Sequence, residues 1–93
     1  MTLSTIDLRQ MIETHVRGGG VAPDLDKLTP QELLDAFAIA SEEWAIVTDL
    51  LDSLSLEEEE PLLARYRARL DRATELRRRA RDLLIDLLNP LPR

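Results

Sequence analysis

Few side chains in this sequence could carry covalent chemistry. The 93 residues include one histidine, His15, and no cysteine, which excludes disulfides, thiolate metal sites and cysteine nucleophiles. His15 lies on an apolar helical stripe, and no serine or acid stands at a spacing that would activate a nucleophile beside it. We interpret it as a half-buried boundary histidine. We therefore predict that the chain is not an enzyme and has no catalytic residue and no cofactor.

The acidic residues also make poor metal sites. Glu57 to Glu60 are consecutive, and consecutive residues of a helix point away from one another, whereas Ca²⁺ and Mg²⁺ need oxygen ligands from several directions. Asp24 and Asp26 lack the residue order of an EF-hand loop. We predict no bound metal, and we expect the glutamates to offset the positive end of a helix macrodipole.

A run of arginines is the main candidate for recognition of another molecule. Residues 65–81 hold eight arginines and two acids, and a basic helix of this kind can lie along a phosphate backbone. Against this interpretation stand the net charge of −6 and the lack of aromatic residues that could stack on bases. The arginines could equally form a solvated flank that pairs with acids of the same chain. Nucleic-acid binding through Arg67, Arg78 and Arg81 is therefore the alternative function.

Composition predicts the kind of element that positions these residues. A chain of 93 residues allows one domain, and 19 residues are leucine whereas Phe, Trp and Tyr occur once each. Leucine favours helices, while strands favour β-branched and aromatic residues. No apolar run reaches the length of a membrane span. We predict a single all-α domain over residues 1–93, located in the cytoplasm.

The first helix is short and ends at glycines. Apolar residues at helical spacing predict a helix at about 5–17, and the three glycines that follow cannot continue it. Residues 18–28 are predicted to form a hinge or irregular connection. Val21, Leu25 and Leu28 in this connection are apolar enough to lie against a core.

Two capping boxes predict where the longer helices begin. Residues 29–32 (Thr-Pro-Gln-Glu) form the first box, with proline at the first helical position, and predict a helix at about 30–53. Residues 55–58 (Ser-Leu-Glu-Glu) form the second and predict a helix at about 57–88. The sequence therefore predicts three helices in a bundle-like arrangement.

The two longer helices are predicted to form an antiparallel hairpin. Apolar residues step by threes and fours along both, as in the facing seams of a coiled coil. Residues 1–60 carry a net charge of −11 and residues 61–93 one of +5, so ion pairs should set the register, and Arg77 should be held in a contact near the seam. The expected pairs are Asp49 with Arg65 or Arg69, Glu42 with Arg72, and Asp35 with Arg77 or Arg79.

A second apolar patch on the second helix does not fit a two-helix hairpin. It consists of Ile39, Ile46 and Leu50, with Glu43 at its edge. Either the first helix folds over the patch with its own apolar stripe, or a partner covers it, which would be a second copy or a different protein. Both can hold, because helical chains with long seams often complete their core by dimerising.

These features predict a non-enzymatic function. We expect a small adaptor, assembly factor or regulator that acts through helical protein–protein interaction, as a homodimer or as a subunit of a larger assembly, without a membrane. Ile39, Glu43, Ile46 and Leu50 are the predicted partner-binding residues.

Overall fold

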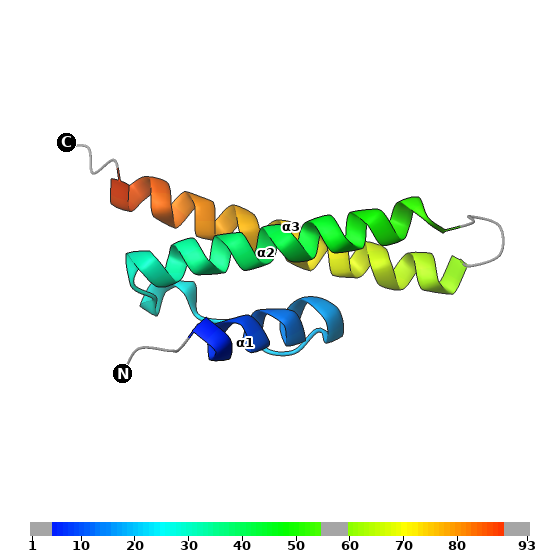
Figure 1. Ribbon diagram of the computed structural model, residues 1–93, viewed down its shortest axis with the longest axis horizontal. Coiled ribbons are helices and arrows are strands. Elements are labelled where there is room, and N and C mark those ends of the chain that lie inside the picture. Colours follow the sequence, from blue (N-terminus) through cyan, green and yellow to red (C-terminus); the bar gives the residue numbers. More distant parts are fainter. Residues whose placement is uncertain (1–4, 55–59, 89–93) are drawn as a thin grey trace.

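The computed structural model describes residues 5–54 and 60–88, which form four helical elements (Figure 1). Helix α1 spans Thr5–Gly18, the 3₁₀ helix η1 spans Leu25–Lys27, α2 spans Pro30–Asp52 and α3 spans Glu60–Leu88. No strand occurs within these described ranges. The predicted all-α class is therefore confirmed.

Helix α1 has one buried apolar stripe and ends at a glycine. Leu8, Ile12 and Val16 stand four residues apart and have almost no exposed surface. Gly19 has a φ of 75°, in the left-handed region where a residue with a Cβ is strained. Its N–H donates to the carbonyl oxygen of His15 at 2.9 Å, which is typical of a helix C-terminus. The predicted end of the first helix at the glycines is confirmed.

The connection from α1 to α2 lies partly against the core. Leu25 of η1 has no exposed surface and Leu28 is partly buried against the same cluster, as predicted. Val21 is 90 % exposed, so its predicted core position is wrong. The reason is its place beside the polar side of α1, where it borders a shallow hollow together with Asp7 and Thr14.

The start of α2 is capped as its sequence predicts. The Glu32 N–H donates to Thr29 Oγ1 at 3.2 Å, and the Thr29 N–H donates to Glu32 Oε1 at 2.8 Å. Pro30 occupies the first turn, where its missing N–H is not needed. The first capping box is therefore confirmed. The second box, at 55–58, and the predicted start of the third helix at 57 lie outside the described residues.

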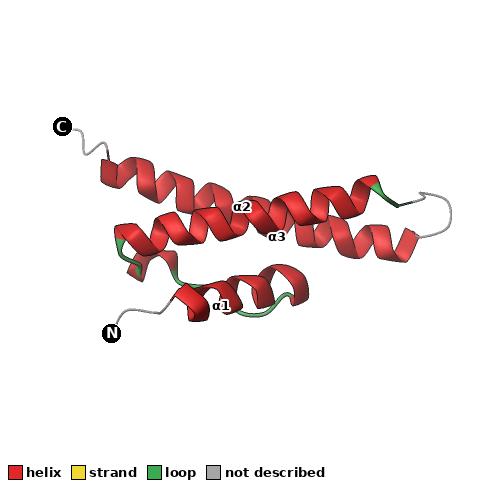
Figure 2. Cartoon of the chain, viewed as in Figure 1, coloured by secondary structure: helices red, strands yellow, loops and turns green. Residues whose placement is uncertain are grey.

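Helices α2 and α3 lie side by side and run in opposite directions, and α1 lies against part of their length (Figures 1 and 2). The principal extents are 53 × 30 × 17 Å and the radius of gyration is 15.0 Å. A compact chain of this length has a radius of gyration of about 12 Å. The structure is therefore elongated, and both long helices extend past the end of α1.

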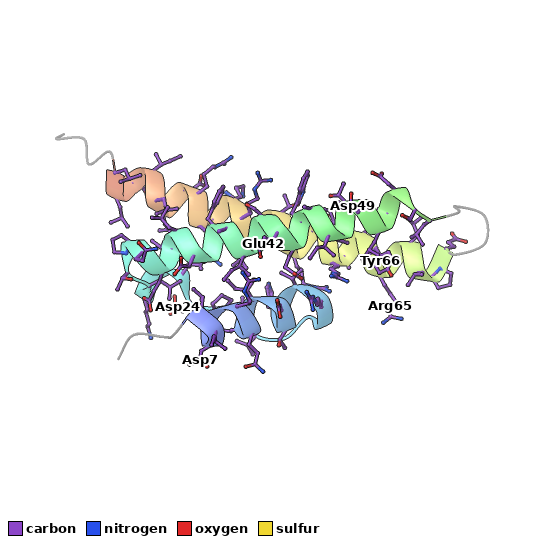
Figure 3. The ribbon with its side chains drawn as sticks, viewed as in Figure 1. Asp7, Asp24, Glu42, Asp49, Arg65 and Tyr66 are labelled. Atoms are coloured by element: carbon purple, nitrogen blue, oxygen red, sulfur yellow. The ribbon has the colours of Figure 1, made fainter. Side chains whose placement is uncertain are left out.

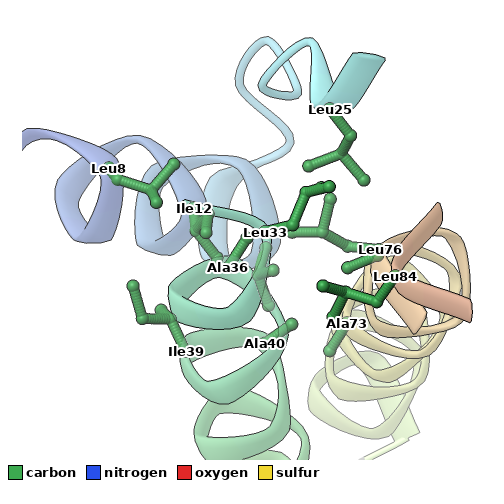
Figure 4. Close-up of a cluster of buried hydrophobic side chains, with 12 residues drawn as sticks. Leu8, Ile12, Leu25, Leu33, Ala36, Ile39, Ala40, Ala73, Leu76 and Leu84 are labelled. Atoms are coloured by element: carbon green, nitrogen blue, oxygen red, sulfur yellow. The ribbon is translucent and has the colours of Figure 1, made fainter. Parts of the chain in front are cut away.

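The core forms where α1, η1, α2 and α3 meet (Figure 4). Four alanines without exposed surface, two from α2 and two from α3, belong to it. Small side chains at a helix crossing allow a short distance between the helix axes, and the seam between α2 and α3 consists partly of alanine here. The buried cluster comprises Leu8, Ile12, Val16, Leu25, Leu33, Ala36, Ile39, Ala40, Ala73, Leu76, Ala80 and Leu84.

Candidate protein-binding interface

Helix α1 covers one end of the second apolar patch of α2. Ile39 is 2 % exposed, shares a buried cluster with Leu8 and Ile12 of α1 and points toward them (Figure 4). The interpretation in which the first helix folds over the patch is confirmed at this residue. Ile39 is thus not on the surface of the chain. Ile46 stays 42 % exposed and Leu50 is half-buried.

Glu43, which the sequence places at the edge of an exposed patch, is instead 1 % exposed. The Arg17 guanidinium in the last turn of α1 donates two parallel hydrogen bonds to it, from Nε to Oε1 at 2.9 Å and from Nη2 to Oε2 at 2.8 Å. Arg69 of α3 places its Nη2 3.7 Å from Oε1. The hydrogen bond to Glu43 raises the pKa of the Arg17 guanidinium above its ordinary value. We call Arg17, Glu43 and Arg69 the buried ion cluster.

The buried ion cluster fixes the end of α1. A buried carboxylate without a partner is strongly unfavourable, and the closest partner of Glu43 comes from α1. A second arginine of α3, Arg72, donates from Nε to the carbonyl oxygen of Val16 at 2.9 Å. This bond satisfies one of the backbone acceptors that the last turn of a helix leaves open. Side chains of α2 and α3 thus hold α1 in one position.

The ion pairs predicted between the two long helices do not form, and one of them is replaced by a pair to α1. Glu42 binds Arg9 Nη1 at 2.8 Å instead of the predicted Arg72, and Asp49 and Arg65 point toward opposite edges of the structure (Figure 3). The prediction was wrong because it considered two helices alone, whereas α1 brings its own arginines to the acidic side of α2. Within the described residues, none of the pairs predicted for Asp35, Glu42 and Asp49 forms.

The side of the α2–α3 pair that faces away from α1 carries exposed apolar side chains. Ile39 and Glu43 contact α1, and position 41 lies about 200° around the helix from each. Positions 34, 37, 41, 44 and 48 recur by threes and fours and therefore share this far side. Leu34 and Ile85 are each 49 % exposed, and Leu88 is 75 % exposed. We call this surface the open face; it consists of Leu34, Phe37, Trp44, Arg67, Arg77, Arg78, Arg81, Ile85 and Leu88.

Arg77 lies between the two large aromatic side chains of the open face. Its guanidinium carbon is 5.6 Å from the centroid of the Phe37 ring and 5.2 Å from that of the Trp44 ring, within the range of cation–π attraction. This confirms the prediction that Arg77 is held in a contact near the seam. A hollow of about 270 Å³ adjoins it, lined by Phe37, Thr74, Arg77, Arg78 and Arg81.

The three arginines of the predicted nucleic-acid surface all belong to the open face, but two of them are paired. Arg78 binds Glu75 at 2.6 Å and Asp82 at 3.1 Å, and Arg81 binds Asp82 at 3.2 Å. The hydrogen bond from Arg78 lowers the pKa of Glu75, so this pair stabilises the fold above the ordinary pKa of a glutamate and less as the pH falls through the lowered value. Arg67 forms no ion pair with any described residue.

The single histidine contacts the turn that ends α1. His15 Nδ1 is 2.7 Å from the carbonyl oxygen of Gly20, and its ring is half-buried beside the turn that ends α1. In the described part of the chain, no three His, Asp or Glu side chains are placed to hold a metal ion. No described helix combines the length and apolar character that crossing a membrane requires.

Comparison with known proteins assigns no role to these surfaces. No family model, no curated protein and no solved structure matches the chain. The open face and the buried ion cluster are therefore the observations from which function is inferred. The sequence did not reveal either one as a unit, although the spacing of Leu34, Phe37 and Trp44 on one side of α2 was available as a signal.

Replacing Arg17 with methionine tests whether the buried ion cluster holds α1. We expect Arg17→Met to lower the free energy of unfolding by about 1–3 kcal/mol, because buried Glu43 would keep only the more distant Arg69. The Arg17 side chain is about half exposed, and contact with water keeps the loss below that of a fully buried pair.

The matched control is Arg9→Met, the same change in the exposed pair with Glu42. It should have a clearly smaller effect, because exposed ion pairs contribute little. Urea denaturation of both variants measures the difference, and equal losses of stability would contradict the role given to the buried ion cluster.

Proposed function

We propose that this chain is a small, non-enzymatic cytoplasmic adaptor, assembly factor or regulator that binds another protein through its open face. The observation that carries the proposal is the exposure of Leu34, Trp44, Ile85 and Leu88 on the side that α1 leaves uncovered. Single exposed apolar residues are common, whereas several on one face are typical of interaction sites. Tryptophan and arginine are also the residues most enriched in the energetic centres of interfaces.

The dimensions of the open face suit a helical partner. Thr48 follows Leu34 by 14 positions on α2 and Leu88 follows Arg67 by 21 positions on α3, which correspond to about 21 Å and about 32 Å of helix. The hollow beside Arg77 lies between the α2 part and the α3 part of the open face. An amphipathic helix of four to six turns would fit along such a surface, as in other helix-in-groove complexes.

Nucleic-acid binding through Arg67, Arg78 and Arg81 is the alternative. These arginines share one face, which favours it. The ion pairs of Arg78 and Arg81 with acids of α3 reduce the positive charge available to a phosphate backbone, and Trp44 already stacks on Arg77. These contacts support protein binding as the main proposal.

Homodimerisation is proposed at a different surface. Ile46 and Leu50 are the part of the predicted patch that α1 does not bury, and a second copy would cover them. We expect a solution mass about twice the 10.6 kDa of one chain, and a monomer for Ile46→Asp. A radius of gyration near 15.0 Å for that monomer would agree with a hairpin closed within one chain. A mass of one chain for the unsubstituted protein would contradict the dimer, and an unchanged mass for the Ile46→Asp variant would contradict the contact at Ile46 and Leu50.

Site-specific photocrosslinking tests the adaptor proposal directly. With p-benzoylphenylalanine in place of Thr74, which lines the hollow, we expect a discrete covalent adduct with one protein in cells of the source organism. The same group in place of Arg65, which is exposed and points away from the structure (Figure 3), should give none.

A second change in the crosslinking chain separates specific from chance adducts. Leu34→Asp combined with Ile85→Asp places charge on two exposed apolar positions and should abolish the adduct, while circular dichroism confirms that the helices remain. The same adducts from both crosslinking positions, or an adduct that survives the double substitution, would overturn the proposal.

A further inference from the structure

We infer that the partner of the open face is an acidic amphipathic helix, whose apolar side chains lie along α2 and whose carboxylates face α3. The inference rests on the proposed function and adds the chemistry of the partner. It follows from the unequal charge of the two edges of the open face.

The α2 edge is uncharged from Leu34 to Thr48, and Asp52 follows at the next position of the stripe. Positions 34, 37, 38, 41, 44, 45 and 48 are Leu, Phe, Ala, Ser, Trp, Ala and Thr. Apolar partner side chains could contact this edge without removing any charge from water, which is the costly step when a charged surface is buried. Two acids of α2 are used within the chain: Glu43 is buried against α1 and Glu42 is paired with Arg9.

The α3 edge is basic. It holds four arginines, and the only acids that neutralise them among the described residues are Glu75 and Asp82. Two positive charges therefore remain uncompensated on a chain whose net charge is −6. Of these four arginines, Arg67 and Arg77 form no ion pair with any described residue.

The spacing of the four arginines along the α3 edge defines what could bind them. Arg67 and Arg81 are 14 residues apart, which is two heptads or about 21 Å along α3. A partner helix lying along α3 with acids on one flank, repeated at heptad spacing, would place carboxylates near both. Such charge complementarity fixes partner choice and orientation more than it adds affinity.

A second copy of the chain is a poorer occupant of the open face. Two identical faces related by a twofold axis would bring together two surfaces with the same excess of arginine, and like charges disfavour that association. The dimer contact proposed at Ile46 and Leu50 is on the other side of α2 and is unaffected.

Three synthetic peptides test the inference on the full chain. Each is a 21-residue amphipathic helix without tryptophan and with the same leucine face, flanked by Glu, by Gln or by Lys. Trp44 is the only tryptophan and belongs to the open face, so its fluorescence reports binding. We expect the Glu peptide to change the Trp44 fluorescence saturably, with a Kd at least about tenfold lower than that of the Lys peptide. Binding of the Glu peptide should weaken at higher salt.

Charge reversal on α3 locates the binding. Arg67→Glu combined with Arg81→Glu should raise the Kd of the Glu peptide by about tenfold or more. The control is Arg65→Glu, which changes an exposed arginine two residues from Arg67 on a different side of α3 (Figure 3) and should leave the Kd unchanged. Circular dichroism confirms that both variants fold.

The outcomes separate the inference from the proposed function. Equal affinity for all three peptides would overturn the acidic partner and leave helix binding standing. No binding of any peptide, together with a specific Thr74 adduct in cells, would overturn the inference alone. Tighter binding of duplex DNA or of phosphatidylserine vesicles than of the Glu peptide, lost in the double variant, would also overturn it, because the face would then recognise phosphate.

Discussion

The structure depends on one buried carboxylate. Glu43 is almost without exposed surface, and a carboxylate in that position must be paired and hydrogen-bonded to remain charged. Arg17 of α1 donates hydrogen bonds to both of its oxygens, and Nη2 of Arg69 of α3 lies 3.7 Å from Oε1. One residue of each helix therefore meets at this point, and the pairing specifies which side of the α2–α3 pair α1 covers.

The position of α1 in turn determines which surface of the α2–α3 pair stays exposed. Because α1 buries Ile39 and binds Glu42 and Glu43, the acidic side of α2 is used within the chain. The opposite side keeps its apolar residues and the arginines of α3. Arg77 lies between Phe37 and Trp44, so the centre of this surface is organised before any partner arrives. An acidic protein thus presents a basic and apolar face.

The local signals of the sequence predicted the helices well. The box at Thr29 and Glu32 and the stop at Gly19 depend on contacts within a few residues, which a sequence contains. The contact of Arg77 near the seam was also predictable, because it follows from helical periodicity alone.

The ion pairs and the open face were not predictable in the same way. The sequence pattern predicts Glu43 at the surface because two helices alone leave it exposed, and only the docking of α1 supplies Arg17 and buries it. The same reason explains why Glu42 pairs with Arg9 and why Arg72 binds a carbonyl of α1. Pairing between distant residues depends on the tertiary arrangement. The prediction for Val21 is wrong because the turn after α1, and not a helical pattern, determines whether its side chain faces the core or solvent.

Native-state hydrogen exchange of the full chain tests most directly the claim that α1 is a fixed part of this fold. The account predicts that the Ile12 and Val16 amides open with the same free energy, within about 1 kcal/mol, as the Ala40 and Leu76 amides, because all four belong to one cooperative core. If the α1 amides exchange many times faster than the amides of α2 and α3, which stay protected, the result would contradict this account. In that case α1 would leave the pair readily, and both sides of α2 would be available to a partner.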